Sequence, residues 1–401
     1  MKSTFLIIFF FAFISFLLNS CAEKNAEYNY CKIPHVHIIS GKDIGFDKKR
    51  RCLIIFEDYS KFSIKKSTIK CRGGFSSKFF KHSYRIELDK KYSPFGLPKE
   101  DDWILNANYI DKTFMRHKLS YDIFRLMSPN NLAPECVYVN VYLNKKYQGL
   151  YVFMQRINAK FCGIDKKDRT TCLFKDPPVF FEEKISFPGS ENNYYDQKYP
   201  EISEQDFTEA LDKFNYFLFN ASDSLFCADI GKWIDIDNVT DWHILLLLSN
   251  NADGLNKNFY IYKKDKNTPL RIAIWDYDHS FGRDGDNELN LLKCQVDCSK
   301  NILLKRLMEL EECNYKIKLV KKWNELRDSK IISVCKIKFM ILKNHFIINH
   351  DVERNFELWP LNSTDYYDDS NYLNEVALMF KYIEIRIPQL DNYFKKLSQT
   401  K

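Results

Sequence analysis

The chain from residue 34 to residue 90 alternates apolar and polar residues, a pattern typical of half-buried β-strands. Gly and Asp turns divide this region into four expected strands, at residues 35–40, 51–58, 67–74 and 83–89. Two more strands are expected further along, at 136–144 and 149–157, joined by the turn Asn144–Gly149. The first half of the chain is therefore predicted to form a sheet.

One helix interrupts these strands. Asp111 is expected to cap it, and the helix is expected to cover residues 112–127. Its apolar residues recur every four positions, which gives one apolar face over about four turns: Met115, Leu119, Ile123 and Met127. Residues 34–160 are thus predicted to be a small β-rich lobe that carries one prominent helix.

The second half, residues 161–401, changes to helical periodicity. Residues 161–202 are rich in Pro, Gly, Asn and Asp and are expected to be a long ordered loop or a connection between lobes. A strand–turn–strand unit is expected within residues 250–282. Helices are expected at 203–222, 237–252, 301–350 and 371–397. Strands followed by helices indicate an α+β fold with two lobes, the second being a large helical lobe at 161–401.

Composition narrows the class of protein. The chain has 401 residues, and 45% of them are hydrophobic, which is enough for one large domain or two modest lobes. The net charge of +7 comes from 60 basic and 53 acidic residues that are spread together, so we expect no nucleic-acid partner. A mildly basic surface is compatible with anionic substrates such as nucleotides.

The first twenty residues are typical of a secretory signal peptide, with a short basic start and a long apolar run. The ending Leu18-Asn19-Ser20-Cys21 matches a bacterial lipobox, which predicts that Cys21 is lipidated and that 21–33 form a tether. A plain signal peptide or an N-terminal anchor helix are the alternatives. No later run is long and apolar enough to span a bilayer. We therefore expect an exported protein that contacts the membrane by its lipid anchor only.

Twelve cysteines are present, and setting Cys21 aside leaves an odd number. Export permits disulfides, and the cysteines closest in sequence are Cys162 with Cys172 and Cys294 with Cys298. Spacing alone does not determine the pairing. A zinc site built on cysteine is not favoured, because the chain contains no C-x-x-C motif.

The segment 250–282 carries the candidate chemistry. Asp253 and Asn258 have D-x4-N spacing, and Asp276 ends the second strand of the expected hairpin, with Asp278 two residues later. Phosphoryl transfer from ATP needs a carboxylate near the attacking hydroxyl, and carboxylate and amide oxygens to hold magnesium. The alternative is structural, with Asp253 in an Asp-Gly turn and Asp278 as a cap.

Several sequence blocks occur in the order seen in a known family, the CotH or spore-coat-protein-H-type atypical kinases. The segment 251–282 resembles the family's Asn-x-Asp…Asn and Trp-Asp-Phe/Tyr-Asp signature. Earlier blocks resemble it as well: RGGFSSKFFKHSYRIELD at 72–89, DDWILNANYIDKTFMRHKLSYDIFRLM at 101–127, APECVYVNVYLNKKYQGLYVFMQRI at 133–157 and LFK at 173–175. The resemblance implies a protein-kinase-like fold with a kinase domain at about residues 50–345.

The resemblance also implies roles for residues. Asp253 would be the catalytic Asp, and Asn258 and Asp276 would bind Mg²⁺ or Mn²⁺, with Asp278 as an extra ligand. ATP would be the second cofactor, and the substrate would be a Ser, Thr or other hydroxyl of a surface or secreted protein. Phosphate contacts are expected from a glycine turn and nearby basic residues: Arg72, Gly73, Gly74, Ser76, Lys81, Arg85 and Lys175, with Arg116 as a further basic candidate.

Two departures from the family pattern support alternatives. Gln155 stands where the family usually has Glu, which removes a charge from any ion pair with a nucleotide-binding Lys or Arg. The glycine block reads Arg72-Gly-Gly-Phe-Ser rather than Arg-Gly-Asn-Ser-Ser. A catalytically weak or inactive surface-binding or adhesion lipoprotein is therefore the alternative hypothesis. A glycan-handling lipoprotein is a weaker one, and its sugar-stacking candidates are Trp103, Trp233 and Trp275.

Overall fold

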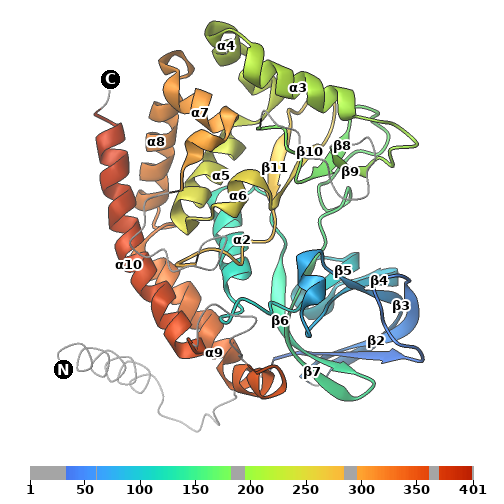
Figure 1. Cartoon of the computed structure of the whole chain (residues 1–401). Helices are drawn as coiled ribbons and strands as arrows, with labels where there is room; N and C mark the ends of the chain where they lie inside the picture. The colour runs from blue at the N-terminus through green and yellow to red at the C-terminus, as the bar shows by residue number, and fades with distance from the viewer. Residues whose placement is uncertain (1–32, 60, 182–194, 284–295, 361–369, 400–401) are drawn as a thin grey trace, which may run out of the picture. The chain divides into compact units, whose positions relative to one another are not determined.

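The computed structural model describes residues 33–59, 61–181, 195–283, 296–360 and 370–399 (Figure 1). Residues Pro34–Lys401 form one compact unit, with strands in its first part and mainly helices in its second. This confirms the α+β prediction, whereas a lobe boundary near residue 160 stays a prediction. The expected signal peptide, Cys21 and all but the last residue of the tether lie outside the described residues.

Seven strands of the first part form a closed barrel: β1 (His35–Ser40), β2 (Arg50–Asp58), β3 (Lys61–Arg72), β4 (Ser83–Tyr92), β5 (Glu100–Asn106), β6 (Cys136–Leu143) and β7 (Lys146–Gln155). Their order around the barrel is β1-β2-β3-β4-β5-β7-β6, and a parallel pair of β6 with β1 closes it. The sequence pattern predicted a sheet but not its closure. It did not single out β5, whose first three residues are all acidic.

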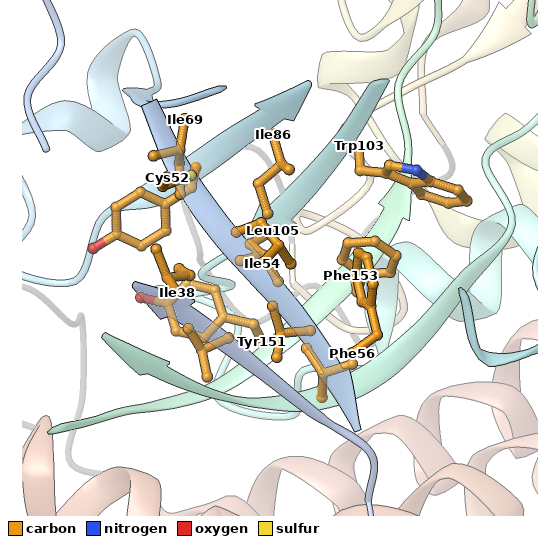
Figure 2. Packing of buried hydrophobic residues seen from close by; sticks show 14 of the residues in the cluster. Ile38, Cys52, Ile54, Phe56, Ile69, Ile86, Trp103, Leu105, Tyr151 and Phe153 are labelled. Atoms are coloured by element: carbon orange, nitrogen blue, oxygen red, sulfur yellow. The ribbon is translucent and has the colours of Figure 1, made fainter. Parts of the chain in front are cut away.

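Strand alternation fills the barrel with apolar side chains. Val36 and Ile38 of β1 are fully buried, while His35 and His37, which alternate with them, point outward and are partly exposed. Trp103 of β5 stacks on Phe153 of β7 with ring centroids 4.8 Å apart. Figure 2 shows these two rings beside the aliphatic residues of the same core, which include Ile38, Ile54, Ile69, Ile86 and Leu105.

The predicted helix after Asp111 is confirmed, but it begins later than expected. Helix α2 covers Arg116–Met127. The Asp111 carboxylate accepts hydrogen bonds from the backbone N–H groups of Thr113 and Arg116, both at 3.0 Å. Phe114 has a positive φ of 59°, so the residues between the cap and the helix form a turn. Asp111 therefore caps α2 across this turn.

A second sheet has the strand order β11-β10-β8-β9. Its strands are β8 (Cys172–Lys175), β9 (Asp196–Tyr199), β10 (Phe259–Lys263) and β11 (Arg271–Ile274). The antiparallel hairpin β10–β11 was predicted, but β8 and β9 lie in the stretch expected to be irregular. Each has only four residues, and their pairing with β10 and with each other forms them.

Helices make up the rest: α3 (Thr208–Asn220), α4 (Asp223–Trp233), α5 (Ile236–Ser249), the single turn α6 (Asp253–Asn256), α7 (Ile302–Glu309), α8 (Tyr315–Asp328), α9 (Val334–Leu358) and α10 (Tyr372–Leu397). Helix α5 is buried over almost its whole length and packs against α2, α8, α10 and β11. It therefore forms the centre of the helical part. No helix in the described ranges combines the length and hydropathy needed to cross a membrane.

One disulfide is present among the described residues, between Cys227 of α4 and Cys313 just before α8. Cys162 and Cys172, neighbours in sequence, are both buried free thiols, so they do not pair. Cys298 is also a free thiol, and Cys294 lies outside the described residues. The observed bond joins cysteines 86 residues apart, a separation that sequence spacing does not reveal.

Candidate active site

The segment 250–282 folds as a helix end, one helical turn and a hairpin. Helix α5 ends at Ser249, its C-cap Asn250 has a left-handed φ of 52°, and α6 begins at Asp253. The Asn251 side chain accepts the Gly254 N–H at 3.0 Å and so fixes this turn. At the open end of the hairpin the Trp275 N–H donates to the Asn258 carbonyl at 2.9 Å. Asn258 and Asp276 consequently lie at the same end of the hairpin.

Lys257 links Asp253 electrostatically to the carboxylates at the end of the hairpin. Its ammonium lies 3.0 Å from the Asp253 carboxylate. Partial burial lowers the pKa of Lys257, but the charges of Asp253, Asp276 and Asp278 outweigh it and raise the pKa above its ordinary value. The charges of Asp276 and Asp278 therefore reach the Lys257–Asp253 ion pair. The structure brings together the predicted catalytic residue and the two predicted metal-binding carboxylates.

Asp276 and Asp278 also lie close to each other. A ligand atom of each, with one of His117, falls within 4.8 Å of the others. Burial, followed by repulsion from Asp276, raises the pKa of Asp278. Two carboxylates held this close are stabilised by a divalent cation, and their hard oxygen atoms suit Mg²⁺ or Mn²⁺. The residues present thus fit the metal that the family resemblance implies.

His117 of α2 was missed by the sequence reasoning. Its Nδ1 accepts the Tyr277 N–H at 2.9 Å, which places the ring proton on Nε2. Nε2 lies 3.6 Å from the Asp276 carboxylate, so the N–H group faces that oxygen and is not free to bind a metal. Tyr121, one helical turn along, accepts the Asp276 N–H through its hydroxyl at 3.0 Å. Helix α2 therefore positions residues 276–278.

A buried network of ion pairs holds the segment that follows Asp278. Arg116 of α2 is 1% exposed and donates to the Asp111 carboxylate at 2.7 Å and to Glu375 of α10 at 3.0 Å. Its Nε donates to the Ser280 carbonyl at 2.8 Å, two residues after Asp278. Arg283 also pairs with Glu375. Arg116 is therefore a structural residue that fastens the segment after Asp278 to two helices, and it is not a phosphate ligand.

Arg72 of the glycine turn reaches the hairpin. Its guanidinium lies over the Trp275 ring, 5.3 Å from the ring centroid. Burial lowers the pKa of Arg72, and the charge of Asp276 is the largest influence opposing that shift. Gly73 has a φ of 140°, and a Cβ there would collide with Ser76, so this turn requires glycine. Among the residues predicted to contact phosphate, Arg72 therefore lies near the carboxylate cluster formed by Asp276 and Asp278.

Lys81 does not extend into that cluster. Its ammonium is buried and donates to the carbonyls of Ala107 and Leu150 and to Asn355 of α9. Burial lowers the pKa of Lys81 well below its ordinary value. Gln155, the departure from the family pattern, accepts the Glu135 N–H at 3.0 Å instead of pairing with a basic side chain. The structure therefore gives no support to a phosphate-binding role for Lys81.

Arg85 and Lys175 have different surroundings. Arg85 forms a bidentate ion pair with Asp102 on the outer face of the barrel, at 3.0 and 2.9 Å, rather than facing the carboxylate cluster. Lys175 lies 3.3 Å from Asp176, whose carboxylate accepts the Phe259 N–H at 3.1 Å. Lys175 therefore lies beside the start of the hairpin, where it pairs with Tyr260 of β10. The sequence reasoning did not single out Asp176.

The tryptophans proposed to stack on sugars are packing residues. Trp103 and Trp275 are 0% and 4% exposed. Trp233 stacks on Phe214 and Phe217 of α3, with centroids 5.6 and 5.2 Å apart. Burial or ring stacking therefore engages all three tryptophans within the protein, and they do not support the glycan hypothesis.

Comparison with known proteins assigns the class. The family model described as CotH kinase protein matches residues 69–387, most of the chain, and the protein belongs to this family. One protein with a similar sequence is the inner spore coat protein H of Bacillus subtilis (strain 168), which is 26% identical over 219 residues. That match spans 53% of this chain and 58% of the relative, less than two thirds of its length.

A solved structure is also similar over much of its length. It is the crystal structure of a Helicobacter pylori proinflammatory kinase, CtkA, with 12% sequence identity and a TM-score of 0.36. The match covers 79% of this chain and 94% of that one. At this TM-score the similarity is too distant to argue from.

Proposed function

We propose that this protein is a divalent-metal-dependent kinase that transfers the γ-phosphoryl group of ATP to a Ser, Thr or other hydroxyl of an exported protein. The observation that supports the proposal most is the close approach of Asp276 and Asp278, whose charges also act on Lys257, the ion-pair partner of Asp253. Membership of the CotH kinase family agrees with it. The protein-kinase-like architecture and the lipid anchor at Cys21 belong to the same proposal.

Each residue has a role that follows from its chemistry. Asp253 accepts the proton of the attacking hydroxyl as that oxygen bonds to the γ-phosphorus, and the bond from phosphorus to the β–γ bridging oxygen breaks. Asn258, Asp276 and Asp278 would hold Mg²⁺ or Mn²⁺, which supplies charge neutralisation for the phosphates. His117 and Tyr121 orient Asp276. Arg72 adds a fixed positive charge on the barrel side of the same residue.

An inactive surface-binding protein of the same fold is the second candidate. The position of Lys81 favours it, because that ammonium is buried and bonded to three acceptors. In a phosphate-binding lysine the ammonium would instead be available to the ligand. The two candidates differ in whether phosphate is transferred.

Phosphate incorporation from Mg²⁺- or Mn²⁺-ATP tests the proposal on the full chain. Asp253→Ala and Asp276→Ala should each lower the rate by about two to four orders of magnitude. Asp265→Ala is the matched control, because this Asp lies at the far turn of the same hairpin and its carboxylate bonds only to turn residues in the contacts seen. Equal incorporation in all four proteins refutes the kinase proposal. If wild type incorporates nothing and ATP with metal does not raise its melting temperature, the binding protein is favoured.

A further inference from the structure

A second cluster of metal-ligand side chains lies on the outer face of the barrel. His35 and His37 are two residues apart on β1 and therefore point to the same face, while Val36 and Ile38 fill the interior. The antiparallel register of β1 with β2 places Glu57 opposite His35. Two hydrogen-bonded strands thus present two imidazoles and one carboxylate together, and β1 is paired on its other side with β6.

The ligand atoms of this cluster already converge. His37 Nε2 lies 2.7 Å from the Glu57 carboxylate and His35 Nδ1 lies 3.5 Å from the same oxygen. All three ligand atoms fall within 4.8 Å of one another. Ligands of a tetrahedral zinc ion with bonds near 2.1 Å are roughly 3.3 Å apart. A small opening of the His37–Glu57 pair would therefore admit an ion, without movement of the backbone.

Packing holds the two rings in place. Tyr142 of β6 lies beside His37 in the parallel pairing that closes the barrel, and its ring stacks on His37 at 4.9 Å with an interplanar angle of 17°. The same Tyr142 ring contacts His35 at 5.4 Å. Fixed rings lose little freedom when they bind a metal.

We propose that His35, His37 and Glu57 form a transition-metal site of the Zn²⁺ class, separate from the carboxylate cluster of the proposed active site. Two imidazoles with one carboxylate favour Zn²⁺, Cu²⁺, Ni²⁺ or Co²⁺ over Mg²⁺ and Ca²⁺, which prefer oxygen ligands. His37 binds through Nε2, and the proton of its neutral ring moves to Nδ1. The side chains remain partly exposed, at 33%, 26% and 45%, so the other coordination positions face water. The site goes beyond the proposed kinase function and does not depend on it.

Zinc titration calorimetry of the full chain at pH 7.5 tests the site. All proteins carry Asp276→Asn, so that binding at the carboxylate cluster is weakened equally throughout. His35→Gln, His37→Gln and Glu57→Gln should each weaken zinc binding at least about tenfold. His345→Gln is the matched control, because this half-buried histidine of α9 bonds to Tyr372 and lies outside the cluster, and it should keep the unaltered affinity.

Two further readouts make the result decisive. Co²⁺ should give visible absorption bands that His37→Gln abolishes, and millimolar Mg²⁺ should not displace the bound metal. Melting curves in EDTA should be the same for the three cluster variants, because their side chains are partly exposed on the outer face of the barrel. The proposal is overturned if His37→Gln binds zinc as tightly as the unaltered site, if His345→Gln loses as much affinity, or if Mg²⁺ competes at a similar concentration.

Discussion

Glu375 offers a direct test of how helix α10 stabilises the fold. Its side chain is 3% exposed and lies between two guanidinium groups, those of Arg116 and Arg283. It accepts from Arg116 Nη2 at 3.0 Å and from Arg283 Nε at 3.2 Å. The change Glu375→Gln keeps the shape of the side chain but removes the negative charge. It also turns one acceptor oxygen into an NH₂ donor that faces other donors.

The expected loss is large because two buried positive charges lose a shared partner. Asp111 still neutralises Arg116, whereas Arg283 loses both carboxylate contacts described here. Removal of one partner from a buried ion pair costs about 3–5 kcal/mol. Since a domain is stable by roughly 5–15 kcal/mol, this single change should remove a large part of the free energy of unfolding.

Urea denaturation at pH 7, followed by tryptophan fluorescence, measures this loss. Glu209→Gln is the matched control, because Glu209 pairs with Lys213 at 2.8 Å but both side chains are more than half exposed. An exposed pair of this kind is worth about 0.2–1 kcal/mol. If Glu375→Gln shifts the free energy of unfolding no more than Glu209→Gln does, the network is not stabilising and the reasoning is wrong.

The pH dependence gives an independent check of the same residue. Burial raises the pKa of Glu375, but its contacts with Arg283 and Arg116 outweigh burial and leave the pKa below its ordinary value of 4.5. A carboxyl group with a lowered pKa stabilises the fold above the pKa of the unfolded chain, and that contribution is lost as pH falls through the folded pKa. The stability gap between wild type and Glu375→Gln should therefore be constant above pH 5 and narrow below about pH 4.5. A constant gap down to pH 3 would contradict the charge argument.

Two further predictions concern covalent and steric features of the helical part. The Cys227–Cys313 bond joins residues 86 positions apart in the sequence. On the chain-entropy model, reducing it should lower the free energy of unfolding by about 4–5 kcal/mol. Dithiothreitol should have no effect on the stability of a variant with serine at both positions. Gly254→Ala would bring a Cβ within 2.7 Å of Leu246, so it should destabilise the fold by about 1–3 kcal/mol and lower the proposed kinase activity. Gly231→Ala, in open space, should be neutral or stabilising. Equal melting temperatures for the two alanine variants would refute the steric argument.

Sequence patterns predicted the strands that have their own alternation and failed where pairing forms the strand. β1 and β4 were predicted from their own residues, whereas β8 has four residues and depends on its contact with β10. Closure of the barrel depends on the pairing of β1 with β6, two strands that are distant in sequence. Local periodicity carries no information about that pairing.

The same division applies to the candidate site. The spacing of Asp253, Asp276 and Asp278 indicated one site, because a helix turn and a hairpin bring these residues together locally. His117 could not be found in this way, since it contacts the backbone 160 residues further along. Lys81 was expected to face phosphate, but its partner Asn355 lies 274 residues away on α9. The long-range packing of these residues decides their roles.

The contact between Glu375 and Arg116 also determines how far the chain can be shortened. A chain ended near residue 345, where the sequence resemblance placed the end of the kinase domain, would lack α10 entirely. Arg116 and Arg283 would then lose their shared buried counter-charge, and α5 would lose the helix that covers its Leu247 and Leu248 carbonyls through Tyr382 and Arg386. For expression and crystallisation, the C-terminal limit of a soluble fragment should therefore be set beyond Leu397.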